Sequence, residues 1–179
     1  MRCWSLRLVC HEGEFEPLLG EPALHHLDLV LAGQAAPRNP NLRLTSERLV
    51  DSPVGWYGLA RLVGKTERDR FPQSPNDLPV PLPTGPSALR STLDHRFKTQ
   101  DLRPRIVGEF EYSAPLAMFA ARGLGVFPVS RLGADDAGLM RGLWLHASSD
   151  GVKKEIHAIR SRRRQHIQRM TQVVTAARP

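Results

Sequence analysis

Short apolar runs alternate with longer amphipathic runs along most of the chain, and turn residues separate them. The clearest example is the stretch 79–130. Two apolar segments, 79–82 and 105–110, each stop at turn or capping residues and each lead into a run with apolar positions at helical spacing. Gly123 is expected to end the second helix, and a third apolar segment, 126–129, follows it. This repeated order of strand and helix predicts an open α/β sheet.

The two helical runs in this stretch begin with residues that are typical of helix starts, and the first run has a clear apolar stripe. Leu89, Leu93 and Phe97 recur at intervals of four residues, which predicts a helix face that packs on the sheet. Pro86 is expected at the first helical position, because its ring presets φ. Ser113 is expected to be the N-cap of the second helix.

The rest of the chain continues the pattern more weakly. Residues 27–32 form a nearly continuous apolar run, as expected for a strand that is covered on both faces. A strand at 6–10 and an amphipathic helix at 15–27 precede it, which together make a βαβ unit. Further extended segments are expected at 42–50, 54–63, 143–146 and 155–160, and a closing helix at 164–177.

Length and composition suit a soluble globular protein. A chain of 179 residues fits one domain, or two small lobes that share a sheet edge. Hydrophobic residues make up 41% and charged residues 24%, which argues against disorder. No apolar run approaches ~18 residues, so no membrane span is expected, and the start lacks the apolar core of a secretory signal. We therefore expect a cytoplasmic protein.

The net charge of +7 is concentrated at one end of the chain. Residues 151–179 hold eight Lys and Arg against Glu155 alone, while the remaining residues balance at 17 positive and 17 negative charges. A cluster such as Arg160 to Arg164 would suit phosphate contacts. Charge runs at a strand-to-helix junction are more often a solvated surface, and we favour that interpretation over nucleic-acid binding.

No motif assembles catalytic or metal chemistry. Gly64, Lys65 and Thr66 look like the end of a phosphate-binding P-loop, but Leu59 stands where that motif needs its first glycine. The two cysteines and seven histidines show neither zinc-site nor HExxH spacing. We therefore expect no enzyme activity, no bound metal and no cofactor.

Four strings of the sequence resemble a known family. They are LRLVCHEGEFEPLLGEPALHHLDLVLAG, LPTGPSALRSTLDHRF, LRPRIVGEFEYSAPLAMFAARGLGVFPVS and EIHAIRSRRRQHIQRM. In order, they resemble the effector-binding domain of LysR-type transcriptional regulators, in particular the subgroup that regulates sodium/proton antiporters. RPRIVGEFE and GLGVFPVS are fairly specific, whereas LDLVLA is common to many LysR-type proteins.

The resemblance implies an α/β fold of two lobes with doubly wound sheets, like a type 2 periplasmic binding protein. One lobe would hold residues 1–55 and 162–179, and the other residues 56–161. Two crossing strands, near 54–62 and 155–161, would join the lobes. An effector would sit between them, and its binding would shift their relative angle and the arrangement of a homo-oligomer.

The chain departs from the family pattern at its start. The winged helix-turn-helix that contacts DNA in the family is absent from the sequence, and so are the first strand and helix of the effector domain. We interpret the chain as a truncated regulator with an incomplete first lobe. Such a loss would expose a sheet edge and an apolar surface, so we expect poor solubility as an isolated monomer.

The expected effector site lies at two helix starts. Backbone N–H groups at Gly85, Ser87 and Ala114 and the hydroxyls of Thr84, Ser87 and Ser113 would favour an anion. Helix capping by Thr84 and Ser113 is an equally good explanation of those two residues.

Other expected contacts complete the site. Glu111 is included as an effector contact. Glu109 and Glu111 lie on the same side of an extended segment, where they would suit a cation, acid/base chemistry or a solvent-facing rim. The remaining expected contacts are an apolar wall from Phe110, Phe127 and Pro128, faced from the other lobe by Ala32 and Gly33.

Three functional classes follow from these observations. The leading one is the effector-sensing domain of a transcription regulator, which would bind a small molecule or ion and reach DNA only through a separate helix-turn-helix. A solute-binding protein of a transporter shares the fold, but the missing signal peptide disfavours it. An α/β enzyme is disfavoured because no nucleophile, base and oxyanion hole come together.

Overall fold

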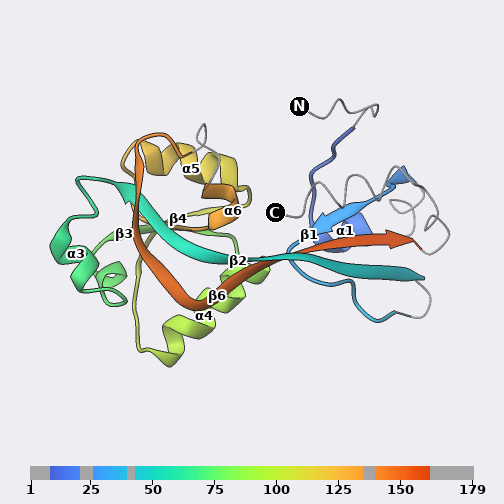
Figure 1. Cartoon of the computed structure of the whole chain (residues 1–179), viewed down its shortest axis with the longest axis horizontal. Helices are drawn as coiled ribbons and strands as arrows, with labels where there is room; N and C mark the ends of the chain where they lie inside the picture. The colour runs from blue at the N-terminus through green and yellow to red at the C-terminus, as the bar shows by residue number, and fades with distance from the viewer. Residues whose placement is uncertain (1–8, 21–25, 40–42, 135–139, 162–179) are drawn as a thin grey trace. The chain divides into compact units, whose positions relative to one another are not determined.

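The chain forms two compact units. The computed structural model describes residues 9–20, 26–39, 43–134 and 140–161. The first unit comprises Met1–Val50 and Glu155–Pro179, and the second comprises Asp51–Lys154. Two long strands, β2 (Leu44–Leu59) and β6 (Leu143–Ser161), each belong partly to one unit and partly to the other (Figure 1).

Two sheets make up the framework. The four-stranded sheet has the order β1-β6-β2-β5. In the first unit β1 (Val30–Ala32) pairs antiparallel with β6, and in the second unit β5 (Phe127–Ser130) pairs antiparallel with β2. The second sheet joins β3 (Pro79–Pro83) and β4 (Arg105–Phe110) in parallel, with a shift of register between Val80 and Pro81.

Short helices connect these strands. Among the described residues the two longest are α4 and α5, both in the second unit, and α5 packs against both β3 and β4. The helices in this part of the chain are α1 (Phe15–Leu19), α3 (Lys65–Asp69), the 3-10 turn η1 (Ser74–Asn76), α4 (Ala88–Thr99), α5 (Ser113–Ala121) and α6 (Arg131–Ala134).

One core of the second unit lies between β3 and α4 and also includes residues of β2, of β6 and of the connecting segments. The predicted stripe is confirmed: Leu93 and Phe97 are buried, and Leu89 packs beside them. The buried members of this cluster are Val54, Trp56, Val63, Val80, Leu82, Leu93, Phe97, Leu102, Val126 and Val152.

A glycine allows the chain to approach β3 closely. Val126 N donates a hydrogen bond to Pro79 O at 2.8 Å. A Cβ on Gly125 would lie only 2.1 Å from the same Pro79 oxygen. Any side chain at this position would therefore push the segment before β5 away from β3.

Helix α5 ends as its sequence predicts. Gly123 has φ of +96°, which favours glycine. Its N–H bonds to Ala120 O, and Leu124 N–H bonds to Phe119 O, which together close the end of α5. The buried face of α5, with Leu116, Ala117 and Ala120, then packs on Phe127 and Met140.

The first unit differs from the sequence expectation in two elements. The helix expected at 15–27 ends at Leu19, because Gly20 is already extended, with ψ of 150°. The strand expected at 27–32 is limited to Val30–Ala32. Its central residue, Leu31, is 51% exposed, whereas its neighbour Val30 is buried, so the two faces of β1 are not equally covered by the described residues. The expectation of a strand buried on both faces is therefore wrong.

Two pairs of expected segments are single strands. The segments at 42–50 and 54–63 are joined in β2, which runs through the exposed Pro53, and those at 143–146 and 155–160 are joined in β6. In contrast, the strand at 105–110 is confirmed at both ends.

Some predictions fall partly or wholly outside the described residues. The strand at 6–10 is one of them, although its described residues Val9 and Cys10 are in no strand. The closing helix at 164–177 also lies outside. The predicted lobe boundaries, after Gly55 and Ser161, fall inside or at the end of β2 and β6, and the lobe assignment stays a prediction.

Candidate functional site at the carboxyl ends of β3 and β4

The carboxyl ends of β3 and β4 lie side by side. Pro83 is the register partner of Phe110, and Thr84 N donates a hydrogen bond to Phe110 O at 3.0 Å. Each strand then leads through a short turn into a helix. The turns that precede α4 and α5 therefore meet at one edge of the second unit, as expected for an open α/β sheet.

The first turn, from Thr84 to Ser87, is half open to solvent. Gly85 is exposed, and a Cβ built on it would meet nothing within 4 Å. Ser87 is the N-cap of α4, and its Oγ accepts a hydrogen bond from Arg90 N at 3.1 Å. Two sequence expectations are wrong here: Pro86 precedes the N-cap instead of opening the helix, and the capping residue is Ser87, not Thr84.

The second turn, from Phe110 to Ala114, is also exposed. The N-cap of α5 is Tyr112, which makes no side-chain capping bond, and Ser113 is the first helical residue. The prediction of Ser113 as N-cap is therefore wrong. Glu111, Ser113 and Ala114 are all exposed, so the Ser113 hydroxyl and the first N–H groups of α5 face solvent.

The residues expected to form an apolar wall are packed to different depths. Phe127 is 1% exposed and belongs to the core beneath α5, and Pro128 is buried as well. Phe110 is half-buried, with its ring centroid 5.5 Å from that of the half-exposed Phe119. Of the three, Phe110 is the one that the structure places at the strand ends and leaves partly accessible.

Ala32 and Gly33 belong to the first unit. Ala32 is half-buried and stands opposite His157 in the pairing of β1 with β6. Gly33 is exposed, and the closest approach to a Cβ built on it is Glu155 O at 3.9 Å. These two residues therefore lie beside His157 and Glu155, which sequence reasoning did not select.

His157 and Glu155 form a bonded pair on one face of β6. His157 Nε2 lies 2.7 Å from Glu155 Oε2, and Arg48 NH1 lies 3.8 Å from the other carboxylate oxygen. The hydrogen bond with His157 lowers the pKa of Glu155 most, burial opposes this, and the positive charge of Arg48 lowers the pKa further. Their spacing of two residues on a strand is the only sequence signal that could have paired them.

Arg90 holds the two strand ends and α4 together. Its guanidinium donates to Pro83 O at 2.9 Å, to Asp94 at 2.9 and 3.0 Å, and to Glu109. Burial lowers its pKa, but the hydrogen bonds to Glu109 and Asp94 outweigh burial and raise the pKa above its usual value. Sequence reasoning missed Arg90; its spacing of four from Asp94 was the available signal.

The ion pairs of Arg90 with Asp94 and Glu109 set the balance of charge at this edge of the second unit. The positive charge of Arg90 faces two carboxylates, and Glu111 adds an exposed third. An anion at this edge would therefore depend on backbone N–H groups and on hydroxyls, not on Arg90.

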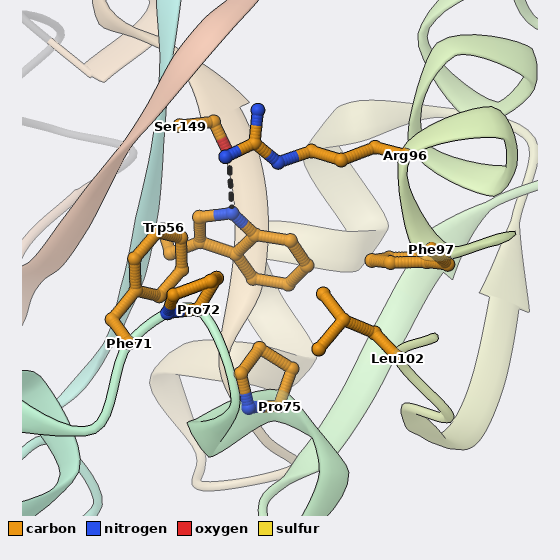
Figure 2. A pocket seen from close by; sticks show the side chains of 8 residues that line it. All are labelled: Trp56, Phe71, Pro72, Pro75, Arg96, Phe97, Leu102 and Ser149. Atoms are coloured by element: carbon orange, nitrogen blue, oxygen red, sulfur yellow. Dashed lines mark hydrogen bonds between the residues drawn. The ribbon is translucent and has the colours of Figure 1, made fainter. Parts of the chain in front are cut away.

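A small pocket lies elsewhere in the second unit, around Trp56 (Figure 2). Trp56 Nε1 donates to Ser149 Oγ at 2.7 Å. The space inside is about 10 Å³, which is room for about one water molecule. The pocket is therefore too small for an organic effector. Its lining side chains are Trp56, Phe71, Pro72, Pro75, Arg96, Phe97, Leu102 and Ser149.

The described residues contain neither a candidate metal cluster nor a candidate membrane-spanning helix. Within the described ranges, no three His, Cys, Asp or Glu side chains gather closely enough to hold a metal ion. None of the helices in that same part of the chain is long and apolar enough to span a membrane.

Solved structures share this fold at low sequence identity. The cofactor-binding domain of the Cbl transcriptional regulator superposes with a TM-score of 0.68 at 15% identity and covers 91% of this chain and 69% of its own. The regulatory domain of CcmR from Synechocystis PCC6803, in complex with 2-PG, gives 0.61 at 16% identity, covering 83% and 72%. The effector-binding domain of QuiR, in complex with shikimate, gives 0.59 at 12% identity, covering 87% and 72%.

The fold class predicted from the sequence is confirmed by these structures. CbnR, a LysR family transcriptional regulator, also matches, with a TM-score of 0.63 at 15% identity over 84% of this chain and 52% of its own. No family model matches the sequence, and no curated protein matches it either. The likeness therefore establishes the α/β fold of LysR-type effector-binding domains, which is that of type 2 periplasmic binding proteins.

Proposed function

We propose that this chain senses a small-molecule effector, as the ligand-binding domain of a LysR-type transcriptional regulator, and that it is not an enzyme. One observation carries the proposal: the carboxyl ends of β3 and β4 and the starts of α4 and α5 meet at one exposed edge. In open α/β sheets, ligands bind at such an edge. The fold shared with the CcmR and QuiR domains, whose structures hold 2-PG and shikimate, supports the same assignment.

The contacts available at this edge suit a small polar effector. Thr84 and Ser113 carry hydroxyls, Gly85 leaves open space, and Phe110 offers a partly accessible ring. The N–H groups at the start of α5 are unpaired within the helix and favour oxygen ligands. Ser87 contributes less, because its Oγ already accepts from Arg90 N, although its hydroxyl proton can still be donated.

The remaining parts of the proposal concern the second contact surface and the partners. Ala32 and Gly33, in the first unit, are kept as proposed effector contacts. At the edge Glu111 would border the effector, while Phe127 and Pro128 would support Phe110 from beneath. Binding would shift the arrangement of a homo-oligomer, and a helix-turn-helix domain would supply the contact with DNA. The sodium/proton antiporter regulators are the proposed subgroup.

A binding screen tests the site. Thermal shift and calorimetry on the full chain would use 2-PG, shikimate and sodium chloride as first probes, followed by a library of small carboxylates and polyols. For the first compound that binds, we expect the double variant Thr84→Ala, Ser113→Ala to weaken affinity about tenfold, which corresponds to roughly 1.4 kcal/mol.

Thr92→Ala is the matched control, because Thr92 lies on α4 and its hydroxyl bonds to Ala88 O within the same helix. Its affinity is expected to match that of the unmodified chain. If the double variant binds as tightly as the control, the effector site lies elsewhere.

A further inference from the structure

A buried histidine ties a loop to β6 in the second unit. His146 is 4% exposed and Ser74 is 2% exposed. His146 Nε2 lies 2.8 Å from Ser74 Oγ, across 72 residues of sequence. Ser74 opens η1, and His146 belongs to β6. The hydrogen bond therefore fastens the segment around η1 to the strand.

The other ring nitrogen of His146 is not satisfied. Nδ1 is buried and has no hydrogen-bond partner among the residues that the structure describes. If Nε2 accepts from Ser74, Nδ1 carries a buried proton without an acceptor; if Nε2 donates, Nδ1 is a buried acceptor without a donor. Protonation would turn both nitrogens into donors and would add a charge, so it makes the buried arrangement costlier.

Aromatic rings surround this bond. The Phe71 ring meets His146 edge to face, with centroids 6.0 Å apart. Phe71 also lies 6.4 Å from Trp56 of β2, and Trp56 lies 6.3 Å from Phe97 of α4. Figure 2 shows Phe71, Pro72 and Pro75 gathered on one side of the Trp56 indole. The loop that carries Ser74 is thus packed against both β2 and β6.

The charged groups near His146 oppose its protonation on balance. Burial and then the positive charge of Arg68 lower the pKa of His146, and the nearby carboxylate of Glu67 offsets only part of this. Both residues belong to α3. Arg70 and Asp77, at the two ends of the loop, pair with each other at 2.6 Å.

We propose that the His146–Ser74 bond is an acid-released latch: at neutral pH it holds the segment 65–78 on β2 and β6, and protonation of His146 releases that segment. The charged imidazole needs water, and the released loop lets water reach it. Arg68, on the same segment, moves away from the new charge. The latch acts without an effector, so it can be tested independently of the proposed function.

The direction of the pH dependence follows from the lowered pKa. In the released state His146 titrates near its usual value, about 6.5. In the latched state it stays neutral to lower pH. The released state therefore takes up the proton first, and the latch weakens as the pH falls below about 6.5, until the latched state is protonated too.

Hydrogen exchange on the full chain tests the latch. Exchange of the backbone amides in 65–78 would be measured by mass spectrometry between pH 8 and pH 5 and corrected for the intrinsic pH dependence of exchange. We expect protection of these amides to fall about tenfold for each pH unit below the midpoint, as single-proton linkage requires, while β3 and β4 amides stay protected.

Two variants remove the titration. His146→Gln keeps a hydrogen-bonding group near Ser74, and His146→Phe keeps a ring against Phe71; in both we expect protection of 65–78 to become independent of pH. His95→Gln, an exposed position on α4, is the control and should behave as the unmodified chain does. The proposal is overturned if either folded variant loses protection at the same pH as the unmodified chain, or if the unmodified chain keeps it until the whole chain unfolds.

Discussion

The second unit holds two regions that are built in opposite ways: the proposed effector edge, at the ends of β3 and β4, and the Trp56 cluster, formed by Trp56 with Phe71, Phe97 and Ser149. At the edge, Gly85 has no neighbour near its missing Cβ, and Glu111 and Ser113 face solvent. Around Trp56, which is 2% exposed, rings contact one another and hydrogen bonds are buried. We therefore expect the fold to tolerate changes at the edge, but not changes in the cluster.

This difference predicts that stability and binding separate in mutants. Changes in the cluster should lower the free energy of unfolding and reach the edge only through loss of the fold. Changes at the edge should leave the fold in place and alter ligand affinity. Three substitutions, from the largest expected effect to the smallest, test the statement about stability, and the Thr84→Ala, Ser113→Ala variant of the binding screen tests the statement about affinity.

Trp56→Ala should have the largest effect. It removes a buried indole together with its bond to Ser149 and its ring contacts to Phe71 and Phe97. We expect the free energy of unfolding to fall by about 3–5 kcal/mol, measured by urea denaturation.

Trp144→Ala is the control for this substitution, because Trp144 is 58% exposed. It should change stability by less than about 0.5 kcal/mol. Equal losses in the two variants would mean that Trp56 does not organise a core.

Arg90→Gln should have an intermediate effect, because Arg90 lies at the edge and anchors α4, the helix whose Phe97 packs on Trp56. Its side chain is 11% exposed, and it anchors α4 to the ends of β3 and β4. Loss of these bonds should cost about 1–3 kcal/mol in urea denaturation. Arg103→Gln, at a side chain that is 87% exposed, should cost less than about 0.5 kcal/mol. A loss at Arg90 no larger than that at Arg103 would show that the network does not hold the edge.

Ser87→Ala should have the smallest effect of the three. It removes the one side-chain cap of α4, the bond from Arg90 N to Ser87 Oγ. Capping bonds of this kind are worth about 1 kcal/mol, so a thermal melt should show a modest shift. Ser91→Ala, one turn along and exposed, should leave the melt unchanged. A drop as large as that of Trp56→Ala would contradict the separation of edge and core.

The sequence predicted the elements whose signals are local. The strand at 105–110, the stripe of Leu93 and Phe97 and the stop at Gly123 each depend on neighbouring residues alone, and the structure confirms them. The helix starts were misplaced by one residue or more. Which residue becomes the N-cap depends on where the backbone turns into the helix, and the residue types Pro86 and Ser113 do not determine that position.

Other features depend on contacts between distant segments. Pro53 made β2 look like two separate segments, and the exposure of Leu31 depends on which other parts of the chain cover β1. The bond between Arg90 and Glu109 spans 19 residues, and that between Ser74 and His146 spans 72. No local pattern contains such information, so the edge could be predicted while its positioning residue and the latch could not.

Amide chemical shifts would locate the effector most directly. The ¹⁵N-labelled full chain would be titrated with the first compound that binds in the screen. We expect the largest shifts at residues 84–87 and 110–116, at the ends of β3 and β4, and little change around Trp56. Shifts concentrated around Trp56, or in the second unit only outside these two turns, would contradict the assignment of the edge as the effector site.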